Sequence, residues 1–110
     1  MYYTYMLRCR DDSIYTGITT DLARRWEEHT GRGRKAAGYT RTHEACGMLA
    51  AFRSENRGAA SRLEYHIKTL SKPQKERLAV DGDLSVLSRK LRPEDYHFLS
   101  RPLQEPERNG

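Results

Sequence analysis

The sequence predicts an α+β fold, with a small three-stranded, mostly antiparallel sheet flanked by helices in the order β-β-α-β-α-α. Near the start of the chain, residue character alternates with the period of two that is typical of strands. Further on, apolar residues recur every three or four positions, which is typical of helices. A length of 110 residues, 36% of them hydrophobic, suits one modest core.

The first nineteen residues predict a β-hairpin. Residues 2–8 are rich in aromatic and β-branched residues that alternate between two faces. Residues 11–13, Asp-Asp-Ser, are a turn signal, and residues 13–19 then predict the second strand. The hairpin would bring Tyr5 and Tyr15 onto neighbouring strands.

A helix is predicted after the hairpin, capped by Thr20 or Asp21 and running to about Thr30. Its inward stripe would comprise Leu22, Trp26 and His29. Residues 31–45 are rich in Gly, Arg, Thr and Lys and predict an exposed basic loop. A short third strand is expected at residues 48–52.

The rest of the chain predicts mainly helices. Asn56 can cap a helix whose buried stripe would be Ala60, Leu63, Ile67 and Leu70. Residues 71–74, Ser-Lys-Pro-Gln, resemble a capping box, so another helix should run to about Val80. Residues 84–91 and 93–96 predict further short helices, and residues 101–110 a loose tail.

The charge distribution suits a polyanionic partner. The net charge is +5, and residues 1–80 carry fifteen Lys/Arg against nine Asp/Glu. Six of the basic residues gather in one stretch: Arg24, Arg25, Arg32, Arg34, Lys35 and Arg41. Such a patch can neutralise the phosphates of DNA or RNA. Charge alone fits a merely solvated face equally well.

Several classes of protein are excluded. No apolar run approaches the roughly 18 residues of a membrane-spanning helix, and the start of the chain has no features of a secretory signal. Cys9 and Cys46 are far apart and lack metal-binding spacing, so free thiols in a reducing compartment are expected. We therefore expect a cytoplasmic protein with no membrane partner.

Five side chains together match the requirements of metal-assisted phosphodiester hydrolysis. Tyr5 and Tyr15 would face each other, Arg25 and His29 are four apart on one helix, and Glu64 lies beside a buried stripe. A glutamate suits Mg²⁺, and an arginine can hold developing negative charge on a phosphate. A tyrosine hydroxyl can position or deprotonate water if a nearby cation lowers its pKa from ~10.

The same positions resemble the GIY-YIG nuclease superfamily. Residues 3–5, Tyr-Thr-Tyr, and residues 15–17, Tyr-Thr-Gly, resemble its two-part signature. Residues 21–25 with His29 resemble the helix that follows, and residues 61–71 resemble the glutamate helix of its small stand-alone bacterial members. The resemblance covers roughly residues 2–80. The departures from the pattern are Tyr3, Thr4 and Thr16 within the signature, and Ile18 where some relatives have lysine.

This resemblance implies a metal-dependent endonuclease acting on nucleic acid, DNA in the first instance, in DNA repair or processing, with Mg²⁺ or Mn²⁺ as cofactor. Tyr5 and Tyr15 would line the water-binding side, one of them as general base. Arg25 would stabilise the transition state, His29 would hydrogen-bond to phosphate or water, and Glu64 would be the single protein ligand to the metal. Residues 1–80 would be the nuclease domain and residues 81–110 a partly helical extension.

Further residues are candidates for contact with nucleic acid: Gly17, Arg24, Arg34, Lys35, Tyr39, Arg41 and Lys68. Gly17 would admit a close approach of backbone or phosphate. No separate recognition domain is evident, so a second copy of the chain or a protein partner would help to supply specificity.

Each catalytic candidate also has a structural alternative. The tyrosines could be ordinary sheet residues, Arg25 could pair with Asp21, and Glu64 could pair with Lys68. His29 could simply end its helix. The competing function is a nucleic-acid-binding module of the same fold with little or no cleavage. A protein–protein adaptor is a third, weaker interpretation.

Overall fold

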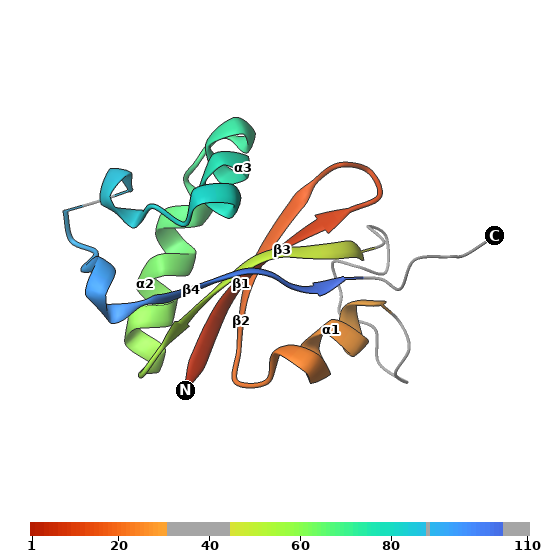
Figure 1. Ribbon diagram of the computed structural model, residues 1–110, viewed down its shortest axis with the longest axis horizontal. Coiled ribbons are helices and arrows are strands. Elements are labelled where there is room, and N and C mark those ends of the chain that lie inside the picture. Colours follow the sequence, from red (N-terminus) through yellow and green to blue (C-terminus); the bar gives the residue numbers. More distant parts are fainter. Residues whose placement is uncertain (31–44, 88, 105–110) are drawn as a thin grey trace.

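The computed structural model describes residues 1–30, 45–87 and 89–104, and its strands form one antiparallel sheet in the order β2-β1-β3-β4 (Figure 1). The strands are β1 (Tyr2–Cys9), β2 (Ile14–Thr19), β3 (Ala45–Ser54) and β4 (His97–Gln104). The helices are α1 (Leu22–Thr30), α2 (Arg57–Lys68) and α3 (Lys72–Asp81). The chain therefore has the predicted α+β character.

The sheet differs from the prediction because the described part of the chain contains four strands, not three. Residues 97–104 pair with β3, although the loose tail was expected from residue 101. Pro102 and the polar neighbours give this segment a weak strand signal, and an edge strand tolerates proline. Its pairing also shifts register opposite residues 48–50, where Arg101 has a positive φ of 45°. Pairing with β3, which is remote in sequence, makes this segment a strand.

Side chains that the sequence predicts as caps are present at the N-terminal ends of the helices. The Arg24 N–H donates to Asp21 Oδ1 at 3.1 Å, so Asp21 rather than Thr20 caps α1. Asn56 Oδ1 accepts from the Ala59 N–H at 2.8 Å at the start of α2. The predicted capping box at the start of α3 is present, with both of its reciprocal bonds.

Two short segments are smaller than predicted. In the described part of this region, Leu84–Val86 and Pro93–Asp95 are helical, each as a single 3₁₀ turn, in place of helices at 84–91 and from 93. Tyr96, directly after the second turn, has extended backbone. Its hydroxyl donates to the Ala59 carbonyl at 2.7 Å, which holds this segment against α2.

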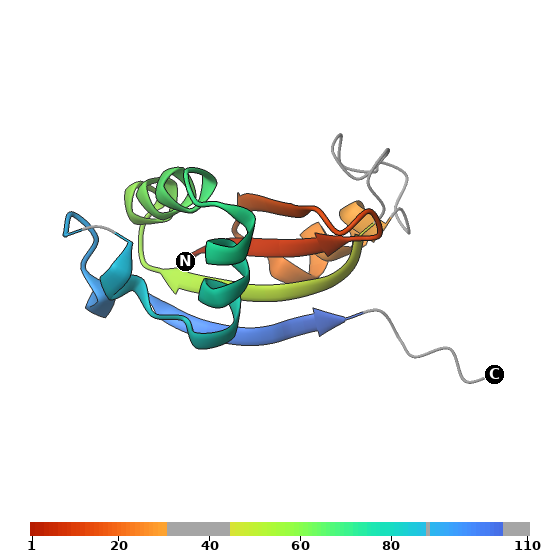
Figure 2. The same cartoon turned by 90° about the horizontal axis from the view of Figure 1, so that it is seen from above.

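The central strand β1 is buried on both faces. Tyr5 and Leu7 join one core cluster with Trp26 of α1, whereas Met6 joins a second cluster with Leu63 of α2 and residues of α3. In Figure 1, α1 accordingly lies apart from α2 and α3. Figure 2 shows β4 as the outer strand beside β3. Consecutive residues of β1 therefore face different helices.

Cys9 and Cys46 are free thiols, and burial raises the pKa of Cys9. Among the described helices, none has the length and apolar character that a membrane crossing would require.

Candidate active site

The Tyr5 side chain lies across the neighbouring strand at Gly17. The two residues are paired in the β1–β2 register, and Tyr5 has no exposed surface. A Cβ at Gly17 would lie 2.6 Å from Tyr5 Oη and 2.8 Å from its Cζ, closer than real Cβ contacts allow. Here the missing side chain accommodates the Tyr5 ring, while a contact between Gly17 and nucleic acid stays a prediction.

The Tyr5 hydroxyl joins two side chains of α1. The Arg25 Nε–H donates to Tyr5 Oη at 3.0 Å, and Tyr5 Oη lies 2.8 Å from His29 Nε2. Arg25 and His29 are four residues apart, so one face of α1 presents both of them. The structure thus brings three predicted catalytic residues into one hydrogen-bonded chain.

The pKa values of Tyr5 and His29 indicate the protonation state of each side chain in this hydrogen-bonded group. Burial raises the pKa of Tyr5 to about 12, although Arg25 opposes the shift. Burial lowers the pKa of His29 to about 4, and the Arg25 charge lowers it further. At neutral pH, Tyr5 is therefore protonated and His29 is neutral. Two uncharged groups therefore share the 2.8 Å hydrogen bond between Tyr5 Oη and His29 Nε2.

Tyr15 packs beside this chain and is more exposed than Tyr5. Its ring centroid lies 6.2 Å from that of Tyr5 and 5.2 Å from that of His29. Tyr15 is only partly buried, whereas Tyr5 is fully enclosed. Of the two tyrosines, Tyr15 is the one with access to solvent.

Arg25 connects the buried hydroxyl with the protein surface. Its side chain is 31% exposed, and Nη1 lies 3.4 Å from Glu28 Oε1. Burial alone would lower the pKa of Arg25, but the hydrogen bond from Arg25 to Tyr5 and the charge of Glu28 outweigh it and raise the pKa. The alternative pairing with Asp21 is not formed by the side chain, because only the Arg25 backbone N–H reaches the Asp21 carbonyl.

Glu64 is not a member of the hydrogen-bonded group that Arg25, Tyr5 and His29 form. Its carboxylate forms a 3.4 Å ion pair with Lys68 and is 27% exposed. Within the described residues it has no hydrogen bond or ion pair to Tyr5, Arg25 or His29. The structural alternative for Glu64, the i,i+4 pair, is thus present.

The donor set around Glu64 suits one kind of metal site. In the described residues, no three His, Cys, Asp or Glu side chains form a metal-binding group. Mg²⁺ commonly binds one or two carboxylates and completes its shell with water and substrate phosphate. The partly exposed Glu64 carboxylate fits that arrangement and does not fit a cage made only of protein ligands.

The other residues that were predicted to contact nucleic acid divide into two groups. Arg24 lines a pocket beside Arg25, and Lys68 is 55% exposed in its pair with Glu64. The remaining predicted residues lie outside the described part of the chain: Arg34, Lys35, Tyr39 and Arg41.

Three further residues near Arg25 were not predicted from the sequence. Tyr2, Glu28 and Arg57 line the same pocket, which has a volume of about 350 Å³. Helical spacing could have pointed to two of them. Glu28 is three residues after Arg25 on α1, and Arg57 is seven residues before Glu64 on α2.

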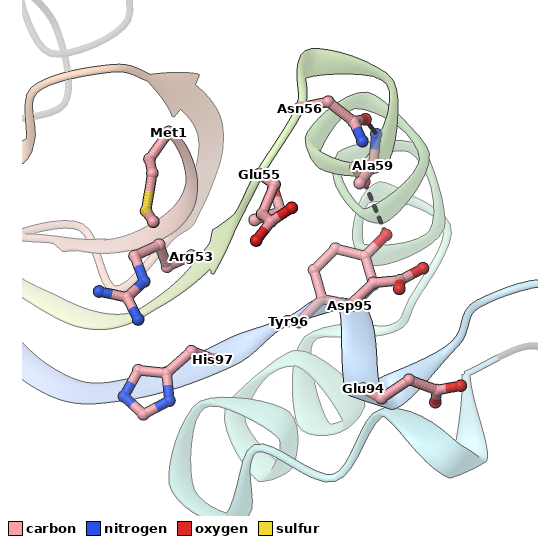
Figure 3. Close-up of a pocket in the computed structure, with 10 residues that line it drawn as sticks. Met1, Arg53, Glu55, Asn56, Ala59, Glu94, Asp95, Tyr96 and His97 are labelled. Carbon is pink, nitrogen blue, oxygen red and sulfur yellow. Dashed lines mark hydrogen bonds between the residues drawn. The ribbon is translucent and has the colours of Figure 1, made fainter.

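A larger pocket of about 460 Å³ lies elsewhere, between the start of α2 and the start of β4 (Figure 3). The charged side chains of its lining are mainly acidic, namely Glu55, Glu94 and Asp95 against Arg53 alone. None of the five predicted catalytic residues lines it. Volume alone therefore does not identify the candidate site, which is defined by the converging side chains of β1, β2 and α1.

Comparison with known proteins gives a consistent result. A family model described as the GIY-YIG catalytic domain matches residues 1–77, which include all five predicted catalytic residues. A UPF0213 protein of Citrobacter koseri is 42% identical over 83 residues, covering 74% of this chain and 80% of its own length. The UPF0213 protein YhbQ of Salmonella arizonae is 44% identical with the same coverage.

A solved structure is also similar in sequence. The UPF0213 protein BH0048 of Bacillus halodurans, determined by solution NMR, is 41% identical. The match covers 73% of this chain and 84% of that protein, with a TM-score of 0.40.

Proposed function

We propose that this chain, which belongs to the GIY-YIG family, is a metal-dependent endonuclease that hydrolyses phosphodiester bonds in nucleic acid. The observation that carries the proposal is the chain of hydrogen bonds from Arg25 through Tyr5 to His29, with Tyr15 packed beside it. An arginine held rigidly at the edge of a buried polar group is well placed to stabilise the charge of a phosphoryl transition state.

Each residue has a distinct role in the proposed reaction. The Arg25 guanidinium binds the phosphoryl oxygens, while Tyr5 and His29 fix its orientation from behind. Tyr15, which reaches solvent, would first release its own hydroxyl proton to solvent and then, as the phenolate, accept a hydrogen bond from the attacking water and take its proton. Tyr5 does not suit that role, because its pKa of about 12 keeps the hydroxyl protonated.

Glu64 would hold the divalent ion, Mg²⁺ or Mn²⁺, together with water and substrate. When bound, the ion polarises a phosphoryl oxygen and stabilises the leaving group. The water oxygen attacks phosphorus, and the bond from phosphorus to the leaving oxygen breaks. The substrate phosphate would bring Glu64 and Arg25 into one site.

We further propose DNA as the substrate, in repair or processing within the cytoplasm. The basic excess of the first eighty residues supports a nucleic-acid substrate. A second copy or a protein partner would contribute specificity, and residues 1–80 would contain the nuclease unit.

The experiment is a cleavage assay on labelled single-stranded, duplex and branched DNA, and on matched RNA. Each substrate is incubated with Mg²⁺, Mn²⁺ or EDTA. We expect metal-dependent cutting that falls about 100-fold or more in Arg25→Ala and in Glu64→Ala. Arg77→Ala is the matched control, because Arg77 is 86% exposed on α3. Failure of the wild type to cut any of these substrates would refute the proposal.

Two observations favour a second candidate, a binding module with little or no cleavage. Glu64 pairs with Lys68 rather than with the Arg25–Tyr5–His29 chain, and Ile18 replaces a lysine found in some relatives. This alternative predicts that Glu64→Ala leaves DNA affinity unchanged and that no metal induces cutting. Cleavage that requires Glu64 would exclude it.

A further inference from the structure

The pocket beside Arg25 gathers three guanidinium groups at one end of the sheet. Arg24 and Arg25 come from α1, and Arg57 is the first residue of α2. Tyr2, at the start of β1, and Glu28 also line this pocket. Because α1 and α2 pack on opposite faces, these side chains meet around the edge strand β2.

The charges in this pocket are only partly neutralised. Glu28 is the one carboxylate among the residues that line it, and it already pairs with Arg25. Arg24 and Arg57 are exposed, and neither forms an ion pair with a carboxylate in the described parts of the chain. Two guanidinium groups therefore remain available to an anion, and each can form paired hydrogen bonds to phosphate oxygens.

The start of α2, which the neutral Asn56 side chain caps, adds to this positive potential, whereas the Asp21 carboxylate at the start of α1 offsets that of α1. Figure 1 shows α1 and α2 starting at the end of the sheet where the chain begins. The N-terminal end of a helix carries a partial positive charge and attracts anions. The larger pocket differs, because carboxylates dominate its charged lining (Figure 3). An anionic ligand would favour the smaller pocket.

We propose that this pocket binds a backbone phosphate of the nucleic acid that lies about three nucleotides from the phosphate that is cut, with Arg57 and Arg24 as positioning residues. This inference rests on the proposed function and adds a substrate subsite to it. Arg57 and Glu64 are seven residues apart on α2, nearly two turns, so they lie on one face. Their separation along the helix is about 10 Å, roughly the axial rise of three nucleotides.

Binding is tested first, in EDTA so that no cleavage occurs. The probe is a fluorescent DNA duplex of 20 base pairs, titrated at several salt concentrations. Arg57→Ala should bind about tenfold more weakly, and its slope of log affinity against log salt should be shallower by about 0.9. Arg57→Lys should keep the slope, because the charge remains. Arg77→Ala should match the wild type, and thermal melts establish that each variant is folded.

Kinetics then locate the phosphate. Arg57→Ala should raise KM about tenfold with kcat within about twofold, whereas Arg25→Ala should lower kcat. Single neutral methylphosphonate linkages are placed at successive positions around the cut. One of them should weaken binding by the wild type but not by Arg57→Ala. The absence of such a position would overturn the subsite.

The two proposals can fail separately. If the wild type cuts DNA and Arg57→Ala binds with wild-type affinity and slope, the subsite is refuted and the nuclease stands. If the wild type neither binds nor cuts DNA or RNA, both proposals are refuted. Selective weakening by Arg57→Ala together with metal-dependent cutting would support both.

Discussion

The Tyr5 hydroxyl has two hydrogen-bonding partners, and both come from α1. The Arg25 Nε–H donates to Tyr5 Oη, and His29 Nε2 lies 2.8 Å from the same oxygen, so two side chains of one helix converge on one buried atom. A buried network with every member satisfied holds its side chains rigidly. Arg25 is thereby oriented before any substrate arrives, which is the arrangement that transition-state stabilisation requires.

His29 should make stability depend on pH. The folded state lowers the His29 pKa from 6.5 to about 4, so between these values the unfolded chain binds more protons. The free energy of unfolding should therefore fall as pH decreases from 6.5 to 4, by up to about 3 kcal/mol. Urea denaturation at pH 4 to 8 would measure this. His29→Gln should flatten that part of the profile, whereas the exposed His97→Gln should not; equal slopes in all three proteins would contradict the prediction.

Gly17→Ala should disturb the site through Tyr5. The added Cβ would lie 2.6 Å from Tyr5 Oη, so the ring must move and its bonds to Arg25 and His29 must lengthen. We expect a loss of about 1–3 kcal/mol in stability and a larger loss of cleavage. Gly58→Ala on α2 is the control, because its nearest contacts are 3.4 Å or longer, and it should stabilise the helix by about 0.5–1 kcal/mol. Denaturant titrations and cleavage rates would separate the two.

At the level of elements, the end of α3 depends on one contact with β4. Gly82 ends α3 with a φ of 64°, and a Cβ there would lie 2.5 Å from Phe98 Cγ. Gly82→Ala should therefore cost at least about 2 kcal/mol, from backbone strain and overpacking together. Phe98→Ala in the same chain removes the Cγ and both Cδ atoms that the new Cβ would meet, so the loss in the double variant should be smaller than the sum of the two single losses. Strictly additive losses in the double variant would show that the two residues do not interact.

The elements predicted from sequence are those with strong local signals. Asn56, Ser71 and Gln74 cap helices through nearby backbone groups, so their pattern is visible in a short window of sequence. The strand β4 has no such signal, because its partner β3 lies more than forty residues earlier in the chain. The 3₁₀ turns were overestimated as helices because tertiary contacts, not periodicity, limit their length.

The candidate site, like the elements, could be predicted from the sequence only where local spacing determines the geometry. The sequence placed Arg25 and His29 on one face of α1, and that spacing follows from helix geometry alone. It could not show that the Tyr5 ring covers Gly17, which depends on how two strands are paired. Arg57 was overlooked because it meets Arg25 only when helices from opposite faces of the sheet converge on the same edge.

At the scale of the whole molecule, β4 lies beyond the segment that matches the family model, and we expect it to contribute to the stability of the fold. The match ends at residue 77, yet β4 pairs with β3 and places Phe98 and Leu99 against the two core clusters. A chain ending at residue 80 should be less stable by several kcal/mol, because large apolar surfaces lose cover. Denaturant titration of the full and shortened chains would measure this. Equal stability would instead support residues 1–80 as a self-sufficient nuclease unit.

The order of the strands gives the two edges of the sheet unequal opportunities for self-association. The β2 edge borders the arginine pocket and the Tyr5 hydroxyl, whereas β4 forms the other edge. A second copy that extended the sheet along β2 would occupy the space that nucleic acid needs, so dimer and substrate would compete. A copy added along β4 would leave the arginines open and place two sites on one continuous sheet, facing outward at its ends.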